Sequence, residues 1–231
     1  MAEQTAAEAK EQYIKAMGDA LGVQYFQLWQ EIAGLHINWA EFLELFGTKT
    51  SRIDLMNRSA GHFFRMVQDS LWETIVLHIA RLTDPSQSPG GKDRLNLTLH
   101  NLPALTPDAT LKDKVVALGK VATDSTAFAR DWRNRHIAHR DLDLALGKTA
   151  KPLPAVPIAQ VKEALDSFEK IMNAVALPYL NSTTSFKHGS IIHGALELIY
   201  LLDDGLTLQE ERRKKLLETD YMTDPWPIRD L

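Results

Sequence analysis

The sequence contains no cysteine and no hydrophobic run of about eighteen residues, and each absence excludes a class of proteins. Without cysteine the chain cannot form disulfides, thiolate zinc sites or a cysteine nucleophile, and this composition is typical of a reducing cytoplasm. The missing hydrophobic run predicts that no segment spans a membrane. Residues 1–10 are charged and rich in alanine, so we also expect no signal peptide and a cytoplasmic location.

The chain also has little excess charge of either sign. Its 231 residues carry a formal net charge of -4, which argues against a protein that coats nucleic acid over its whole surface. A local basic patch is compatible with this value. The length is long for one domain and short for two, and it suffices for one sizeable core without disulfides.

Hydrophobic periodicity predicts an all-α protein. Apolar residues recur at helical spacing, and no stretch alternates over enough residues to demand a strand. We expect helices over residues 5–18, 23–46, 53–82, 107–139, 158–178, 191–202 and from 207 onward. The short connection after residue 46 favours antiparallel neighbours in an up-down helical bundle. We therefore predict an N-terminal polar helix or arm (1–20), a bundle of long helices (21–180) and a C-terminal helical extension (181–231).

Local signals predict where these helices end and which residues they bury. Gly205 is expected to end a strongly apolar helix that is buried on most sides, and Thr207 to open a charged helix through a capping box with Glu210. His36 and His78 lie on apolar stripes and are interpreted as core residues. Aromatic residues at helical spacing are likewise expected in the core: Phe26, Trp29, Phe63 and Trp72.

One basic segment departs from this packing pattern. Residues 133–139 read Arg-Asn-Arg-His-Ile-Ala-His and follow a helix whose apolar stripe ends at Trp132. Because burying an unpaired cation costs several kcal/mol, this end of the helix must face water or meet an anion. One interpretation is a basic helix C-terminus that complements the helix macrodipole, and the other is an anion-binding site.

Arg133, Asn134 and His139 resemble the motif of the HEPN superfamily (higher eukaryote and prokaryote nucleotide-binding domains), in which an arginine and a polar residue precede a histidine. Residues 77–84, Leu-His-Ile-Ala-Arg-Leu-Thr-Asp, are similar to its abortive-infection, AbiU-like branch, and residues 137–141 agree with it. The resemblance covers residues from about 21 to 178. It implies a homodimeric helical bundle in which two such motifs form one cleft. It also implies a metal-independent endoribonuclease, often a toxin or phage-defence effector, that uses the 2′-hydroxyl of RNA as nucleophile.

The resemblance assigns a role to each motif residue. Arg133 would hold the scissile phosphate, because its planar guanidinium matches phosphate oxygens. His139 would move a proton, since the reference pKa of histidine is about 6.5. Asn134 would position the phosphate or the histidine by hydrogen bonds. Further candidate phosphate contacts are Arg135, His136, Arg140 and Arg81. For Arg81, which lies off the main apolar stripe, an ion pair with a carboxylate elsewhere is the favoured alternative.

Three hypotheses for the function stay open. The first is the endoribonuclease, and the second is a catalytically silent HEPN-like module that binds a nucleotide or a partner protein. The third is a metal-dependent hydrolase that uses His136, His139, Asp141 and Asp143, although the neighbouring arginines would repel a divalent cation. We expect no metal and no cofactor. The expected partners are RNA, a second copy of the chain and an antitoxin such as a nucleotidyltransferase. Asp141, however, replaces the tyrosine that such a partner modifies in some members.

Overall fold

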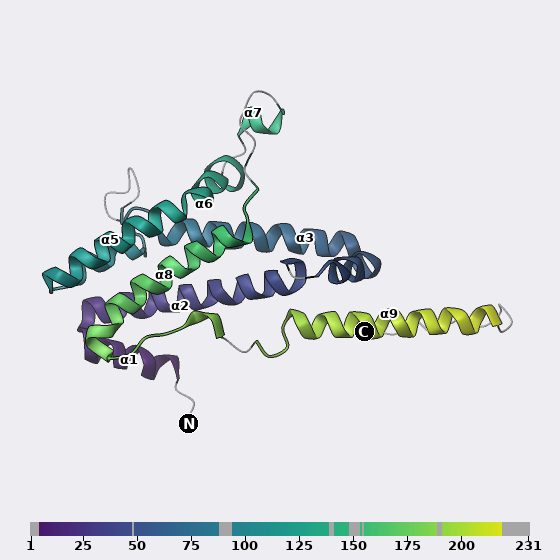
Figure 1. Cartoon of the computed structure of the whole chain (residues 1–231), viewed down its shortest axis with the longest axis horizontal. Helices are drawn as coiled ribbons and strands as arrows, with labels where there is room; N and C mark the ends of the chain where they lie inside the picture. Colours follow the sequence, from purple (N-terminus) through teal and green to yellow (C-terminus); the bar gives the residue numbers. More distant parts are fainter. Residues whose placement is uncertain are drawn as a thin grey trace. The chain divides into compact units, whose positions relative to one another are not determined.

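The computed structural model describes residues 5–47, 49–87, 94–138, 141–147, 153, 155–188 and 191–218 (Figure 1). Within these ranges every regular element is a helix, and the strand-like geometry is one isolated bridge between Gln87 and Leu95. The predicted all-α class is therefore confirmed. None of the helices in the described ranges is long and apolar enough to cross a membrane.

The helices fall into two compact units, which we describe separately. Unit 1 comprises Met1–Trp39 and Leu71–Ser190, and unit 2 comprises Ala40–Ser70 and Ile191–Leu231. The division into residues 1–20, 21–180 and 181–231 stays a prediction. The elements are, in chain order, α1 (Ala6–Met17), α2 (Asp19–Phe42), η1 (Leu43–Gly47), α3 (Thr50–Leu82), η2 (Leu99–Asn101), α4 (Leu102–Leu105), α5 (Ala109–Ser125), α6 (Ala127–Trp132), η3 (Arg133–Ile137), α7 (Leu142–Ala145), α8 (Ile158–Leu180), η4 (Phe186–His188) and α9 (Ala195–Glu218).

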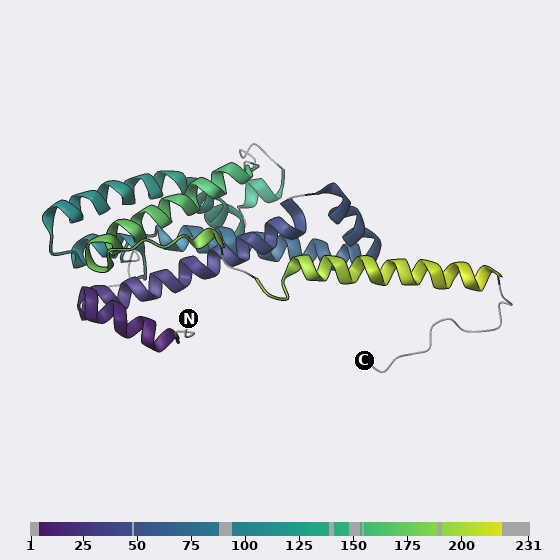
Figure 2. The same ribbon diagram turned by 60° about the horizontal axis from the view of Figure 1, so that its bottom comes forward.

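Unit 1 is a helical bundle whose core is filled by aliphatic and aromatic side chains. Helix α5 packs along α8, as both views show (Figures 1 and 2). The α2 and α8 segments of this unit each bury one face completely, as their helical periodicity requires. The largest side chains with almost no exposed surface include Tyr25, Leu28, Ile32 and Leu35 on α2, Ile75 and Ile79 on α3, and Phe168, Ile171 and Met172 on α8.

The N-terminal helix pair is set by three local features. Thr5 and Glu8 form a capping box that begins α1. Gly18 adopts a φ of 83°, a value that L side chains rarely adopt, and this residue separates α1 from α2. Gly22 on α2 then meets the backbone of α1, because a Cβ built there would lie 2.6 Å from the Tyr13 carbonyl oxygen. The absence of a side chain at Gly22 therefore permits the two helices to approach.

Unit 2 is built from η1, the first part of α3 and α9. The carboxylate of Glu41 accepts a hydrogen bond from the first amide of α9, on Ala195, at 2.5 Å. Arg52 on α3 donates to the Glu44 carbonyl oxygen at 2.6 Å and also contacts the Glu44 carboxylate. Ala60 departs from helical geometry, with φ -156° and ψ 60°, so α3 is kinked within this unit.

The prediction of a single helix over residues 107–139 is wrong. The structure divides it at Thr126, which has φ -101° and ψ 7° and separates α5 from α6. The Thr126 hydroxyl donates to the Ala122 carbonyl oxygen at 2.8 Å, and it lies 2.8 Å from the Thr83 hydroxyl on the neighbouring chain segment. Threonine that bonds back to a carbonyl one turn earlier bends a helix, and the buried partner at Thr83 fixes this bend.

The predicted end at Gly205 and the capping box at Thr207 are also wrong, because α9 runs without a break from Ala195 to Glu218. A glycine inside a helix costs about 1 kcal/mol relative to alanine, which the surrounding strong helix formers offset. The apolar segment before Gly205 was expected to be buried on most sides, yet Ile192 and Leu201 are 78% and 63% exposed. Phe63, another predicted core residue, is 52% exposed.

Replacing Gly22 by alanine should destabilise unit 1. The added methyl would press on the backbone of α1, which has no flexible side chain to move away, so we expect a loss of about 1–3 kcal/mol in unfolding free energy. Gly34→Ala on the same helix is the matched control, since its Cβ would meet nothing within 4 Å. This control should stabilise the protein by about 0.5–1 kcal/mol through helix propensity. Denaturant unfolding of both variants tests this, and equal effects would contradict the close approach.

Candidate functional site

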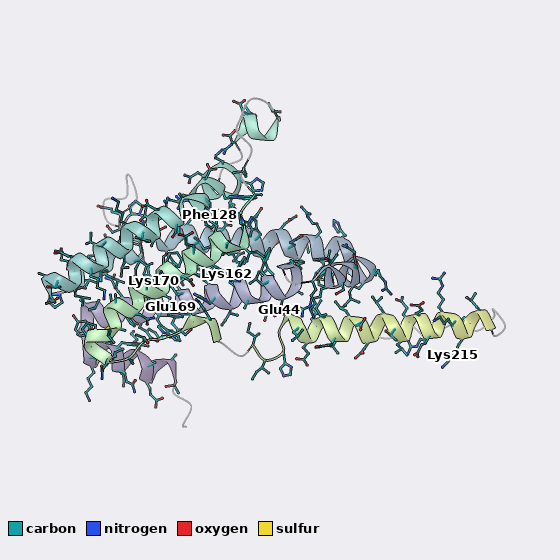
Figure 3. All side chains as sticks on the ribbon, viewed as in Figure 1. Glu44, Phe128, Lys162, Glu169, Lys170 and Lys215 are labelled. Atoms are coloured by element: carbon teal, nitrogen blue, oxygen red, sulfur yellow. The ribbon has the colours of Figure 1, made fainter. Side chains whose placement is uncertain are left out.

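The basic segment 133–139 begins where α6 ends and continues as a π-helical turn. Helix α6 is anchored by Phe128 (labelled in Figure 3) and Ala129, which are 5% and 0% exposed. The turn Arg133–Ile137 follows, and the amide of Ala138 donates to the Arg133 carbonyl oxygen at 2.8 Å, five residues back. Such wide turns are rare within helices and are frequent at functional sites.

Arg133 is held in place by two acceptors. Its Nη1 atom lies 2.5 Å from Oδ1 and 2.6 Å from Oδ2 of Asp84, the residue that follows the last turn of α3. Its Nε atom donates to Oδ1 of the adjacent Asn134 at 3.1 Å. Both charged side chains of the ion pair are about one-fifth exposed, at 22% and 21%. Within the described part of the chain, Arg133 makes these bonds through Nη1 and Nε, and Nη2 makes none.

A second arginine one turn earlier reinforces this arrangement. Arg130 donates from Nη1 to the hydroxyls of Thr83 at 3.1 Å and Thr126 at 2.9 Å, and from Nη2 to the Thr123 carbonyl oxygen at 2.5 Å. Thr83 and Thr126 are 3% and 0% exposed. Burial lowers the pKa of Arg130 from its ordinary value; the charge of Arg133 lowers it further, while that of Asp84 opposes the shift. Arg133 forms the ion pair with Asp84, whereas among the described residues Arg130 bonds only hydroxyl and carbonyl oxygens and feels the charges of Asp84 and Asp124 without pairing with either.

The other basic residues of the segment have separate partners. Arg135 donates to Asp131 at 3.2 Å, within the same helix. His136 lies 3.6 Å from Oε1 of Glu73 on α3 and packs edge-on against Trp132. Trp132 in turn contacts Trp72 with ring centroids 5.7 Å apart, which joins the end of α6 to α3. Asn134 is exposed to solvent.

Arg81 is brought to a different carboxylate from the one that holds Arg133. Its Nη2 atom lies 2.7 Å from Oε2 of Glu31, and Nε2 of His78 lies at the same distance from this oxygen. Burial lowers the pKa of His78, and the charge of Arg81 lowers it further while Glu31 opposes the shift. His78, Arg81 and Glu31 thus form a contact between α2 and α3. This geometry matches the ion-pair alternative for Arg81, and its predicted phosphate contact stays a prediction.

His139 and Arg140 lie outside the described residues, so the joint role of Arg133 and His139 in one site stays a prediction. The metal-site hypothesis used His136, His139, Asp141 and Asp143. Among the residues that the structure does describe, no group of three or more histidine, aspartate or glutamate side chains could hold a metal ion. The backbone amide of Asp141 donates to the Arg135 carbonyl oxygen at 3.1 Å.

Sequence reasoning missed the residues that hold the arginine. Asp84 closes the segment 77–84 that carries the resemblance, and no role at the site was predicted for it from the sequence. Arg130 stands three positions before Arg133 on the same helix, and this spacing was a usable signal. The roles of Thr83 and Thr126 had no such signal, because their two hydroxyls meet only when α3 and α6 pack together.

Replacing Asp84 by asparagine should destabilise unit 1. The change removes the carboxylate that pairs with the part-buried Arg133, so we expect the unfolding free energy to fall by about 1–3 kcal/mol. Asp69→Asn is the matched control, because Asp69 pairs with Arg65 where both side chains are more than half exposed. Such an exposed pair contributes at most about 0.5 kcal/mol. Thermal or denaturant unfolding measures the stability of both variants. A loss of stability in Asp84→Asn no larger than that in Asp69→Asn would refute the role of Asp84 in holding Arg133.

Comparison with known proteins places the whole of this site within one family. Residues 18–193 match the family model for AbiU2 of the HEPN superfamily. No curated protein and no solved structure matched the chain in the corresponding comparisons. The matched range contains Asp84, Arg130, Arg133 and His139, and it stops before α9. The chain belongs to the AbiU2 family of HEPN domains.

Proposed function

We propose that this protein is a metal-independent endoribonuclease that acts as a homodimer in the cytoplasm. Two findings support the proposal: the chain belongs to the AbiU2 family of HEPN domains, and the arginine of its Arg-Asn-x-x-x-x-His sequence is fixed in a part-buried position. The role of a toxin or phage-defence effector belongs to the same proposal, because the family is an abortive-infection branch.

The observation that carries the proposal is the way in which Arg133 is held. Asp84 engages Nη1 and Asn134 engages Nε, so the guanidinium plane is oriented before any substrate binds. In the proposed complex a phosphate oxygen would bind Nη2, which makes no hydrogen bond to the described residues. Arg130 supplies the additional positive charge that offsets the Asp84 carboxylate, which would otherwise oppose an approaching phosphate.

The proposed reaction needs only groups of RNA and of this chain. The 2′-oxygen attacks the adjacent phosphorus, a bond to it forms, and the bond from phosphorus to the 5′-oxygen breaks. The products are a cyclic phosphate and a 5′-hydroxyl, and the proton lost by the nucleophile is balanced by one delivered to the leaving oxygen. His139 would move one of these protons, and Arg133 would stabilise the negative charge that develops on the phosphoryl oxygens.

The partners are proposed on the same basis. A second copy would bring a second Arg133 and His139 to a shared cleft, as the family resemblance implies. An antitoxin such as a nucleotidyltransferase would restrain the enzyme. Asp141 cannot accept the modification that some members carry on a tyrosine at this position, so such a partner would act here by binding.

The same ion pair also favours a second candidate, a catalytically silent module that binds a nucleotide or a partner protein. Arg133 already has a counter-ion in Asp84, and an incoming phosphate must compete with it. In this alternative the pair is structural, and Arg133 contributes to stability and not to chemistry.

The test is an RNA cleavage assay in the presence of EDTA, with single-stranded RNA and the purified chain. Wild-type protein should cleave with unchanged rate after metal removal. Arg133→Ala should lower the rate by about 10²–10³, the usual cost of removing one preorganised group that stabilises charge in a transition state. His139→Ala should lower it by about 10²–10⁴ through loss of proton transfer.

Two control variants remove the same residue types from exposed positions on α3. Arg65→Ala and His62→Ala should cleave as the wild type does, since both side chains are exposed. Circular dichroism of each variant checks that the fold is retained. Cleavage that persists in folded Arg133→Ala and His139→Ala would remove both residues from the mechanism. Complete inactivity of wild-type protein on varied RNA substrates would favour the silent module.

A further inference from the structure

Unit 2 contains a groove between the start of α3 and the first half of α9. It has a volume of about 490 Å³, and its cationic lining comes from Lys49, Arg52 and Arg58. Leu196 and Tyr200 contribute the α9 wall. All of these residues belong to unit 2, so the groove lies within a single compact unit.

A second hollow of about 830 Å³ lies against the later part of α9, and Arg58 lines both. Its other cations are Arg212, Arg213 and Lys214. We call the two hollows together the α3–α9 groove.

The α3–α9 groove is basic in a chain that is acidic overall. Its lining contains six cationic side chains and three carboxylates, from Asp54, Asp203 and Glu210. The Arg52 charge is matched by Glu44 outside the lining, which reduces the excess to two positive charges. The chain as a whole carries a net charge of -4, so the net charge of the groove is opposite in sign to that of the whole chain.

Four of these cations form no ion pair with the residues that the structure describes. Lys214 pairs with Glu210 at 3.8 Å, but within the described residues Lys49, Arg58, Arg212 and Arg213 make no ion pair. The groove therefore presents positive charge that is not used to hold the fold. Surface lysine and arginine side chains are often simply solvated, so charge alone does not specify a ligand.

An exposed aromatic ring is the second feature of the groove, beside its positive charge. Tyr200 lines the groove and is 64% exposed, and Leu196 beside it is 42% exposed. An aromatic face next to a track of cations is the combination that binds single-stranded nucleic acid, where the cations contact phosphates and the ring stacks on a base. An acidic peptide would use the cations but would gain little from an open ring face.

We propose that the α3–α9 groove binds a single-stranded segment of RNA, with Tyr200 stacked on a base and Arg58, Arg212 and Arg213 on the phosphates. The choice of RNA as the ligand rests on the proposed function. The positive charge of the groove and the exposed ring of Tyr200 are observed independently of that function. Helix α9 begins at Ala195, beyond the 18–193 range of the family match. The groove is therefore built with an element outside the matched region, and it would give this chain substrate contacts that the matched region does not contain.

The experiment measures binding of a labelled, short oligouridylate to the full chain by fluorescence anisotropy, across a range of salt concentrations. All proteins carry Arg133→Ala, so that cleavage does not consume the probe. Tyr200→Ala should weaken binding by about 10-fold through loss of stacking. Arg58→Ser combined with Arg213→Ser should reduce the slope of log affinity against log salt by about 1.4, which corresponds to two phosphate contacts on a single strand.

Arg65→Ser and Lys215→Ser (Lys215 is labelled in Figure 3) are the matched controls, because they remove one cation each from α3 and α9 outside the groove lining. These controls should bind as the parent does. Unchanged affinity in folded Tyr200→Ala and in the double arginine variant would overturn the proposal. Polyglutamate that competes with RNA and binds Tyr200→Ala as well as the parent would also overturn it, in favour of an acidic protein partner.

Failure of the cleavage proposal and failure of the groove proposal give different results. If wild-type protein cleaves no RNA but the groove variants still weaken oligouridylate binding, the groove proposal stands without the nuclease. If wild-type protein cleaves RNA and the groove variants bind it normally, only the groove proposal is overturned.

Discussion

The ion pair between Asp84 and Arg133 ties the end of α3 to the end of α6, and the candidate site depends on it. Both residues stand just beyond the last α-helical turn of α3 and α6. Thr83 and Thr126 sit directly behind the pair and bond to each other and to Arg130. The arginine is thus supported by a buried polar network and not by packing alone.

The same network explains why cations gather at this end of a helix whose earlier part is apolar. Two arginines near one carboxylate keep a net positive charge that would be costly if it were fully buried. At about one-fifth exposure, Arg133 retains access to solvent and therefore to an anion. An arginine whose guanidinium is oriented by Asp84 and Asn134 is compatible with both proposed functions, binding of a phosphoryl group and a purely structural ion pair.

Positive charge in this acidic chain is concentrated at the candidate site of unit 1 and in the α3–α9 groove of unit 2, and the cations of these two regions differ in their hydrogen-bond and ion-pair partners. In unit 1 the cations of the site are engaged by carboxylates and hydroxyls, which orient them. In unit 2 the groove cations Arg58, Arg212 and Arg213 have no carboxylate partner among the described residues. Oriented charge suits stabilisation of a transition state, whereas surface charge without an ion-pair partner suits a flexible polyanion whose contacts vary along its length.

The sequence by itself determined the all-α class and the family, and it singled out Arg133 as a candidate site residue. These follow from local signals: hydrophobic period, and a short run of residues whose chemistry does not fit a packed helix end. It did not determine the break at Thr126, the continuation of α9 through Gly205 or the exposure of Phe63. Local propensity at Gly205 is overridden by neighbouring helix formers, and burial of Phe63 depends on what packs against it. Only the tertiary structure brought Asp84 to Arg133, 49 positions apart, because residues that distant meet through helix packing and not through spacing along the chain.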